Sequence, residues 1–229
     1  KETALIVFAR SGLSASLARL FAKAGMRVAL AARNTDKLAA LASETQARVL
    51  RCDASRREDV EALFAAVEQN PGPPDLVVYN PSARARGPIA ELDPDEVLRA
   101  LIVSCHGGFL VGQRAARLML ARGHGTILFT GASASVKGYA NSAPFAMGKF
   151  GLRGLVQSMA RELAPKNIHV AHFVIDGGIR RADDQRAAAR GPDGMLEPDA
   201  IAANYLHVHR QHRSAWTWEM ELRPWVESF

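Results

Sequence analysis

The regular alternation of short apolar runs with helical periodicity constrains this chain more than any other feature of its sequence. The apolar runs predict strands over residues 4–8, 27–32, 47–53, 76–80, 125–131, 169–176 and 216–223. Helical periodicity covers residues 13–24, 36–44, 57–68, 95–122, 145–163 and 198–209, where 95–122 is one long helix or two short ones. Continuous apolar strands that alternate with helices are typical of a parallel sheet with both faces covered. Right-handed crossovers then predict an α/β fold with a single doubly wound, Rossmann-like parallel sheet.

The chain is expected to form a single domain over residues 1–229, because α/β domains of ~200–250 residues are common. The one long segment without periodicity covers residues 179–196 and is polar and rich in glycine, aspartate and arginine. We interpret this segment as a lid over the binding site or as a disordered loop.

The composition excludes several other classes of protein. Two cysteines, Cys52 and Cys105, are too few for a disulfide framework, so a cytoplasmic protein is expected. No apolar run approaches the ~18 residues of a membrane span. The formal net charge is +6, from 29 basic and 23 acidic side chains, but the two signs are interspersed. This pattern favours a solvated surface with a few phosphate-binding arginines over a nucleic-acid groove.

Several polar residues follow the predicted strands, at the sheet edge where doubly wound folds bind their ligands. Residues 7–14 join the first strand to the first helix and contain Gly12. Arg33, Asp53 and Asn80 come at the ends of the second, third and fourth strands. These positions are therefore expected to surround one site.

With these features, the chain resembles the short-chain dehydrogenase/reductase family over its whole length. The chain length, the order of the elements and the segment Asp176-Gly177-Gly178 all match that family. The resemblance implies a single Rossmann-like domain, a nicotinamide cofactor and a small-molecule carbonyl or alcohol substrate. It also implies a homodimer or homotetramer, with no nucleic-acid and no membrane partner.

The family's motif Thr-Gly-x-x-x-Gly-x-Gly falls on residues 7–14, and only Gly12 of its three glycines remains. Phe8 replaces the first glycine, and a phenylalanine does not easily adopt a positive φ. Its ring is also expected to compete with a cofactor for space. Ser14 replaces the third glycine, and its hydroxyl and the neighbouring backbone N–H groups can still bind a phosphate.

The resemblance assigns the remaining cofactor contacts. Arg33 stands where the family reads the adenosine ribose, and a guanidinium there favours the 2′-phosphate of NADP over the 2′-hydroxyl of NAD. Arg10 would be a second phosphate ligand, and Asp53 would bind the adenine amino group. Asn80 is retained from the family's Asn-Asn-Ala-Gly segment. The expected cofactor is therefore NADP, with NAD as the alternative.

The family's catalytic set of Asn, Ser, Tyr and Lys is incomplete in this chain. Its Tyr-x-x-x-Lys motif falls on Phe145 and Lys149, which share one helix face. Phe145 lacks the hydroxyl of the family's tyrosine. The retained Lys149 would bind the nicotinamide ribose. Ser104 stands at the Asn position, and Ala132 stands at the Ser position, one residue before Ser133.

Other side chains are candidates for the missing acid. Tyr139 precedes Phe145 in the loop over the expected pocket, where it supplies a hydroxyl or only packs beside the substrate. Lys149 acts as an acid if burial lowers its pKa, although a lysine that leans to the surface is the commoner outcome. Ser133 would fix the carbonyl group.

Two hypotheses remain open. The first is an NADP-linked oxidoreductase with Lys149, Ser133 and Tyr139 as its catalytic residues. The alternative is a catalytically inactive binding or scaffold protein that keeps the fold. No metal is expected, because the late histidines do not converge on one face. Gly148, Gly151 and Gly154, at a spacing of three, are expected to let a helix of a second subunit approach closely.

Overall fold

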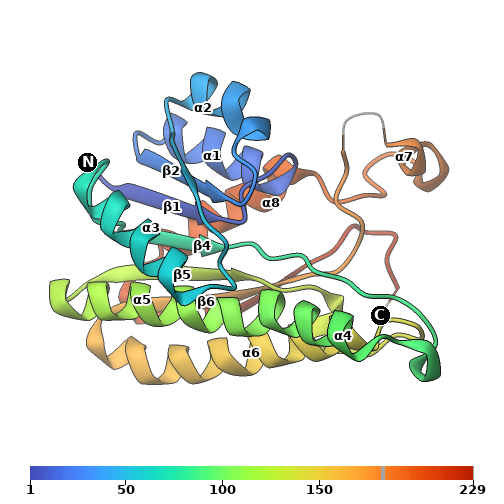
Figure 1. The fold of residues 1–229 in the computed structure, drawn as a ribbon. Helices are drawn as coiled ribbons and strands as arrows, with labels where there is room; N and C mark the ends of the chain where they lie inside the picture. Colours follow the sequence, from blue (N-terminus) through green and yellow to red (C-terminus); the bar gives the residue numbers. More distant parts are fainter. Residues whose placement is uncertain (182–183, 229) are drawn as a thin grey trace.

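Within residues 1–181 and 184–228, which the computed structural model describes, seven strands form one fully parallel sheet (Figure 1). The strands are β1 (Thr3–Val7), β2 (Arg27–Ala32), β3 (Arg48–Arg51), β4 (Leu76–Tyr79), β5 (Gly125–Thr130), β6 (Ile168–Ile175) and β7 (Glu219–Leu222). Their order is β3-β2-β1-β4-β5-β6-β7. Because the chain first builds the sheet from β1 toward β3 and then from β4 toward β7, the predicted doubly wound sheet is confirmed.

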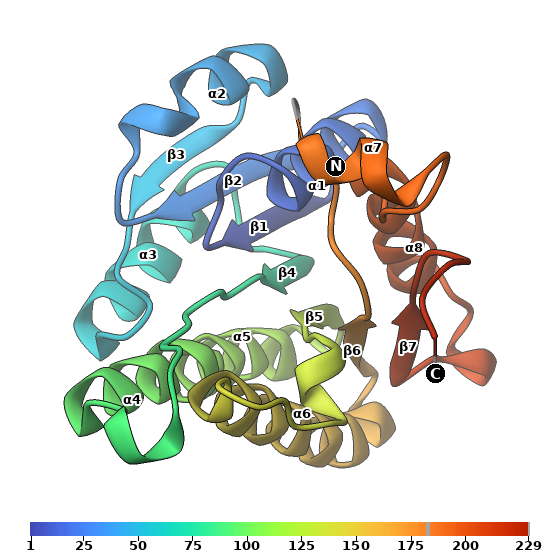
Figure 2. The same cartoon turned by 90° about the vertical axis from the view of Figure 1, so that its right-hand side faces the viewer.

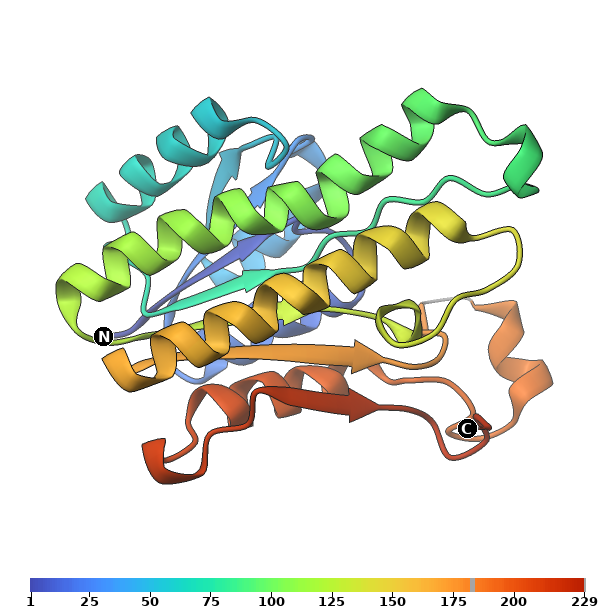
Figure 3. The same cartoon turned by 90° about the horizontal axis from the view of Figure 1, so that it is seen from below.

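Helices cover both faces of this sheet (Figure 2). They are α1 (Leu13–Lys23), α2 (Ala39–Thr45), α3 (Arg57–Gln69), α4 (Pro94–Leu101), α5 (Gly107–Arg122), α6 (Ala143–Leu163), α7 (Gln185–Arg190) and α8 (Pro198–His209). One face carries α1, α2 and α8, and the other carries α3, α5 and α6. Figure 3, which views the molecule from below, shows α5 and α6 side by side in front of the sheet. In the described part of the chain, no helix is both long and apolar enough to cross a bilayer.

Two hydrophobic cores lie on the two faces of the sheet, and the strands supply both. In β1, Ala4 and Ile6 face α1 and α8, whereas Leu5 and Val7 face α3, α5 and α6. Side chains alternate between faces along a strand, so a strand buried on both faces must be apolar throughout. This is why the central strands stand out in the sequence as continuous apolar runs.

The predicted helix over 95–122 is one continuous helical run that contains a π turn. Residues Ile102–His106 form this π turn between α4 and α5. It packs closely against α6, because a Cβ on Gly148 would lie 2.7 Å from Cβ of Ser104. A Cβ on Gly151 would lie 2.9 Å from Sγ of Cys105.

The glycines at a spacing of three admit a neighbouring helical segment of the same chain. Gly148 and Gly151 let the chain's own π turn approach α6, and the homo-oligomer stays a prediction. Gly154 alone of the three has open space beside it, because a Cβ added there would have no atom within 4 Å. Any contact of this helix face with another subunit would have to involve Gly154 and the exposed side chains nearby.

Three other predicted segments have different bounds in the structure. The helix over 36–44 begins as a 3-10 turn before α2. The last strand is shorter than 216–223, because Gln211 holds the backbone N–H of Thr217 in a turn, at 2.8 Å. The segment 179–196 is not irregular throughout: it contains α7 and a bridge between Ile179 and Leu196. Residues 182 and 183 of the predicted lid lie outside the described residues.

Candidate functional site

The turn after β1 has the backbone shape of a glycine-containing turn although it starts with phenylalanine. Phe8 adopts a φ of 67° and Gly12 a φ of 85°. The expectation that Phe8 avoids positive φ is therefore wrong. Such a conformation costs a non-glycine residue roughly 1–3 kcal/mol. The packing of the Phe8 ring edge-on against Tyr79, at 5.7 Å between centroids, offsets part of that cost.

The Phe8 ring does not cover Gly12. Apart from Gly12 and its two chain neighbours, no atom lies within 4 Å of the position where a Cβ on Gly12 would stand. The first turn of α1 has no side-chain cap and no acidic residue. Unsatisfied N–H groups and the positive end of a helix dipole favour an anion at such a position.

Ser14 and Asn80 join the loops after β1 and β4. Asn80 Nδ2 donates to Ser14 Oγ at 2.8 Å, and Ser14 Oγ donates to the carbonyl oxygen of Phe8 at 3.3 Å. Both residues are buried, Ser14 completely. The Ser14 hydroxyl thus points inward, and only the backbone at the start of α1 is left to contact a phosphate.

The two remaining predicted cofactor residues of the adenosine side lie at the ends of β2 and β3. Arg33 is exposed directly after β2. Asp53 accepts hydrogen bonds from Ser55, at 3.0 Å from the backbone N–H and 2.6 Å from Oγ. Partial burial opposes ionisation, but the Ser55 hydrogen bonds and the charges of Arg33 and Arg56 hold the pKa of Asp53 below its ordinary value.

Lys149 is buried, against the expectation of a lysine that leans to the surface. Its side chain is on the sheet-facing side of α6 and is 2% exposed. Nζ donates to the carbonyl oxygen of Thr130 at 2.8 Å and to that of Pro81 at 3.1 Å. Burial first, and then the charges of Arg84 and Arg10, lower its pKa to about 7. A lysine with this pKa changes its charge in the neutral range.

Phe145 lies one helical turn before Lys149 and contacts two cations. The Lys149 ammonium is 5.9 Å from the centre of the Phe145 ring, and the Arg84 guanidinium carbon is 4.2 Å from it. Cations are attracted to the electron-rich face of an aromatic ring. No sequence motif points to Arg84, because its position depends on the path of the loop that follows β4.

A cleft of about 480 Å³ lies beside this ring and brings together the predicted substrate residues. Ser133, Tyr139 and Phe145 all line it, together with Arg84, Arg86 and Lys137. Tyr139 is 42% exposed, and the Lys137 ammonium lies 5.8 Å from its ring centre. Lys149 is behind Phe145 and does not line the cleft. The structure thus places Ser133 and Tyr139, but not Lys149, in the lining of this cleft.

Ser135, the other serine of this loop, belongs to a buried chain of polar groups. Its Oγ is 3.3 Å from Nε2 of His172, and Nδ1 of His172 is 3.0 Å from Glu219. Arg153 donates twice to the same carboxylate. The order Ser–His–Glu is that of a hydrolase triad. However, Ser135 and His172 are completely buried and so out of reach of a substrate, and this chain of contacts holds the loop after β5 against β6 and β7.

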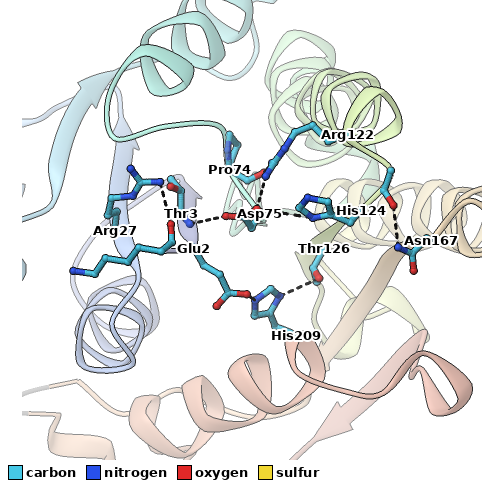
Figure 4. Close-up of polar contacts among 12 residues, drawn as sticks. Glu2, Thr3, Arg27, Pro74, Asp75, Arg122, His124, Thr126, Asn167 and His209 are labelled. Carbon is cyan, nitrogen blue, oxygen red and sulfur yellow. Dashed lines mark hydrogen bonds and ion pairs between the residues drawn. The ribbon is translucent and has the colours of Figure 1, made fainter.

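At the opposite edge of the sheet, several charged side chains form hydrogen bonds and ion pairs with one another (Figure 4). Asp75 accepts from the backbone N–H of Thr3 at 2.8 Å and pairs with Arg122 at 2.5 Å. His209 lies between Thr126 and Glu2, at 3.0 Å and 3.2 Å. These contacts tie the chain start to β5, α5 and α8. Asp75, Arg122, His209 and Glu2, at the amino ends of the strands, therefore have partners within the chain.

The described residues contain no group of three or more His, Cys, Asp or Glu side chains that could hold a metal ion. His209, one of the histidines of the late helix, contacts Thr126 and Glu2 at the amino edge.

Comparison with known proteins identifies the family of this chain. The family model "short chain dehydrogenase" matches residues 2–186. The chain is 28% identical over 188 residues to the 3-oxoacyl-[acyl-carrier-protein] reductase MabA of Mycobacterium tuberculosis, covering 81% of this chain and 74% of that protein. It is 31% identical over 176 residues to a "Putative ketoacyl reductase" of Streptomyces coelicolor, covering 74% and 67% of the two chains.

Two solved structures agree with this result. A short-chain dehydrogenase from Rhodopseudomonas palustris is 38% identical, with a TM-score of 0.84 over 98% of this chain and 99% of that one. A variant of actinorhodin polyketide ketoreductase, solved with NADPH, is 26% identical, with a TM-score of 0.88 over 98% and 96% of the two chains. The chain belongs to the short-chain dehydrogenase family.

Proposed function

We propose that this protein is an NADP-linked oxidoreductase that acts on a small carbonyl or alcohol substrate. The observation that carries the proposal is the free space beside Gly12 at the positively polarised start of α1, with the exposed Arg33 at the end of the adjacent β2. The first feature suits a diphosphate and the second suits the 2′-phosphate that distinguishes NADP from NAD. When bound, the nicotinamide would supply or accept the hydride.

The residues that would hold the cofactor are those at the carboxyl edge of β1 to β4. Gly12 and the backbone at the start of α1 would contact the diphosphate. Arg10, in the same turn, would be a further phosphate ligand. Arg33 would contact the 2′-phosphate, and Asp53 the adenine. Asn80 acts by holding Ser14 and hence the shape of the turn, at 2.8 Å. Lys149 would contact the nicotinamide ribose.

The proton that the substrate oxygen accepts in the proposed reduction has to come from a group other than Phe145. Phe145 offers packing only, and the cleft beside it holds the hydroxyls of Ser133 and Tyr139. Ser133 would hydrogen-bond the substrate oxygen, and Tyr139 would reach it from the loop. Lys149, with its pKa lowered to about 7, changes its charge at neutral pH next to the Phe145 ring, and its charge would act on the groups in the cleft. Cytoplasmic location is part of the same proposal.

The alternative function is a binding or scaffold protein without turnover. The substitution of phenylalanine for the catalytic tyrosine favours it, because a ring without a hydroxyl transfers no proton. The two functions share the fold and the cofactor residues and differ only in the chemical step.

We further propose a homodimer or homotetramer. The outer face of α5 and α6 exposes Phe109, Met147 and Phe150, at 41%, 50% and 45%. Exposed apolar side chains grouped on neighbouring helices are typical of a subunit interface. Light scattering after gel filtration would give the mass of two or four subunits, and a mass of one subunit would contradict the proposal.

The direct test of the function is NADPH oxidation, measured by absorbance with a panel of small ketones, aldehydes and 3-oxo acids. The proposal expects substrate-dependent oxidation by the wild type and a lower rate with NADH. The matched control is Arg33→Gln, which should lose the preference for NADPH while keeping the fold. Binding of NADPH with no turnover of any substrate in the panel would support the scaffold function instead.

A further inference from the structure

Within the described part of the chain, two cations of the cleft beside Phe145 have no hydrogen-bond or ion-pair partner, although its acids are all paired. Its acidic lining residues are Asp176 and Glu227. Asp176 pairs with Arg223 at 3.1 Å and with Lys137 at 3.8 Å. Glu227 pairs with Arg190 at 2.7 Å. No carboxylate of this lining is left to neutralise a further cation.

Arg84 and Arg86 are the lining cations that remain. Both are exposed to the solvent of the cleft, and within residues 1–181 and 184–228 neither guanidinium has a hydrogen bond or an ion pair. Arg84 is nevertheless held in one place, because its guanidinium carbon stacks 4.2 Å from the Phe145 ring centre. A stacked guanidinium keeps its N–H groups directed outward at its edge, where they can donate to a ligand.

The field around these two arginines is positive. The charges of Arg86, Arg10 and Arg181 act on Arg84 and, after burial, lower its pKa. Like charges that are placed together without an acid raise the free energy of the folded chain. An anion in the cleft would remove that cost, and the fork of an arginine suits the two oxygens of a carboxylate or phosphate.

We propose that the cleft binds a small organic anion, a carboxylate or a phosphate, through Arg84 and Arg86. The reacting carbon of that anion would lie beside Ser133 and Tyr139, which line the same cleft. The description of the anion as a substrate rests on the proposed oxidoreductase function; its binding does not. Arg10, which the proposed function assigns to the cofactor diphosphate, does not line the cleft.

The test is isothermal titration calorimetry of the full chain with acetoacetate, inorganic phosphate and the uncharged ethyl acetoacetate. Acetoacetate or phosphate should bind, and the ester should bind at least about tenfold more weakly, because it lacks the charge-assisted hydrogen bonds. Arg84→Gln and Arg86→Gln should each weaken anion binding by about tenfold. Arg161→Gln is the matched control: Arg161 is exposed on α6, away from the cleft lining, and its loss should leave the affinity unchanged.

The two anions distinguish the ligand class. Tighter binding of acetoacetate assigns a carboxylate, and tighter binding of phosphate assigns a phosphate ester. Equal affinity for acetoacetate and its ester, or equal affinity in Arg84→Gln, Arg86→Gln and Arg161→Gln, overturns the proposal. Competition between the anion and NADPH would also overturn it, because the arginines would then serve the cofactor.

Anion binding and NADPH binding are measured separately, so that this proposal and the proposed function can fail independently. A protein that binds acetoacetate in an Arg84-dependent manner but shows no melting shift with NADPH has an anion site without an oxidoreductase site. A protein that binds NADPH but no anion retains the proposed function and loses this inference.

Discussion

At the residue scale, the chemistry depends on what stands around the Phe145 ring. Lys149 is fixed behind it by two carbonyl oxygens, and the Arg84 guanidinium lies on its face. The ring itself is 8% exposed and lines the cleft. A hydroxyl added to this ring would lie among groups that favour its ionised form, because both neighbours are cations.

Phe145→Tyr should therefore raise kcat by at least about tenfold for whichever substrate is turned over, since general acid–base catalysis contributes ~10²–10⁴-fold. The Kd for NADPH should stay unchanged. Phe150→Tyr is the matched control, because Phe150 is on the same helix but is 45% exposed and outside the cleft lining. An unchanged kcat in Phe145→Tyr would show that the absence of a tyrosine hydroxyl does not limit the rate.

Loss of all activity in Tyr139→Phe would identify the Tyr139 hydroxyl as the proton donor of the wild-type protein.

Lys149 predicts a pH dependence of stability. Its pKa is about 7 in the folded chain, against an ordinary lysine value of 10.5. Between these values the unfolded chain binds more protons, so the free energy of unfolding rises with pH, by up to ~1.4 kcal/mol per unit. Below the folded pKa both states are protonated and this dependence ends.

Urea unfolding of the wild type and of Lys149→Met over roughly pH 6 to 10 would measure this effect. The wild type should gain stability relative to the variant as the pH rises above 7. Parallel curves for the two proteins would show that Lys149 keeps an ordinary pKa.

At the element scale, the contact between α6 and the π turn of residues 102–106 determines which positions of α6 require glycine. Gly148→Ala would place a Cβ 2.7 Å from Cβ of Ser104, so the helices must separate. It should lower the free energy of unfolding by ~1–3 kcal/mol. Gly154→Ala has no neighbour within 4 Å and removes a flexible residue from a helix, so it should raise that free energy by ~0.5–1 kcal/mol. Equal effects of the two substitutions on urea unfolding would contradict the described packing.

The elements themselves are largely predictable from the sequence. The central strands are buried on both faces, and a continuous apolar run is the signature of such a strand. The prediction for the last strand is too long, because Trp216 and Thr217 look like strand residues but are held in a turn by Gln211. The π turn is not predictable, since it depends on how closely α6 approaches and not on the local sequence.

The candidate site is predictable only in part. The sequence predicts that Ser133 and Tyr139 lie near Phe145 and that Lys149 shares its helix face. In the structure Ser133 and Tyr139 line the cleft beside Phe145, and Lys149 contacts its ring. The burial of Lys149 is not predictable, because it results from carbonyl oxygens of two distant segments. The position of Arg84 depends in the same way on the path of the loop after β4. The inward direction of the Ser14 hydroxyl follows from a contact across 66 residues, which no local pattern encodes. The functional roles of these residues stay predictions.

At the scale of the whole molecule, the two edges of the sheet differ in charge. The amino edge joins its carboxylates to arginine and histidine, as in the contacts of Asp75 and Glu2 (Figure 4). The carboxyl edge gathers Arg10, Arg33, Arg84 and Arg86 around the start of α1 and the cleft. Because Asp176 and Glu227 of the cleft are paired within the chain, the arginines of this edge leave positive charge that attracts anions. This distribution agrees with an anionic cofactor and an anionic ligand at one edge.

The measurement that tests the central claim most directly is the melting temperature of the full chain with and without NADPH. A ligand that binds only the folded state stabilises it by mass action, and about 1 mM NADPH should raise the melting temperature by on the order of 5 °C. NADH should give a smaller shift, and Arg33→Gln should remove the difference between the two. No shift with either nucleotide in the wild type would contradict the account, because the start of α1 would then hold no dinucleotide.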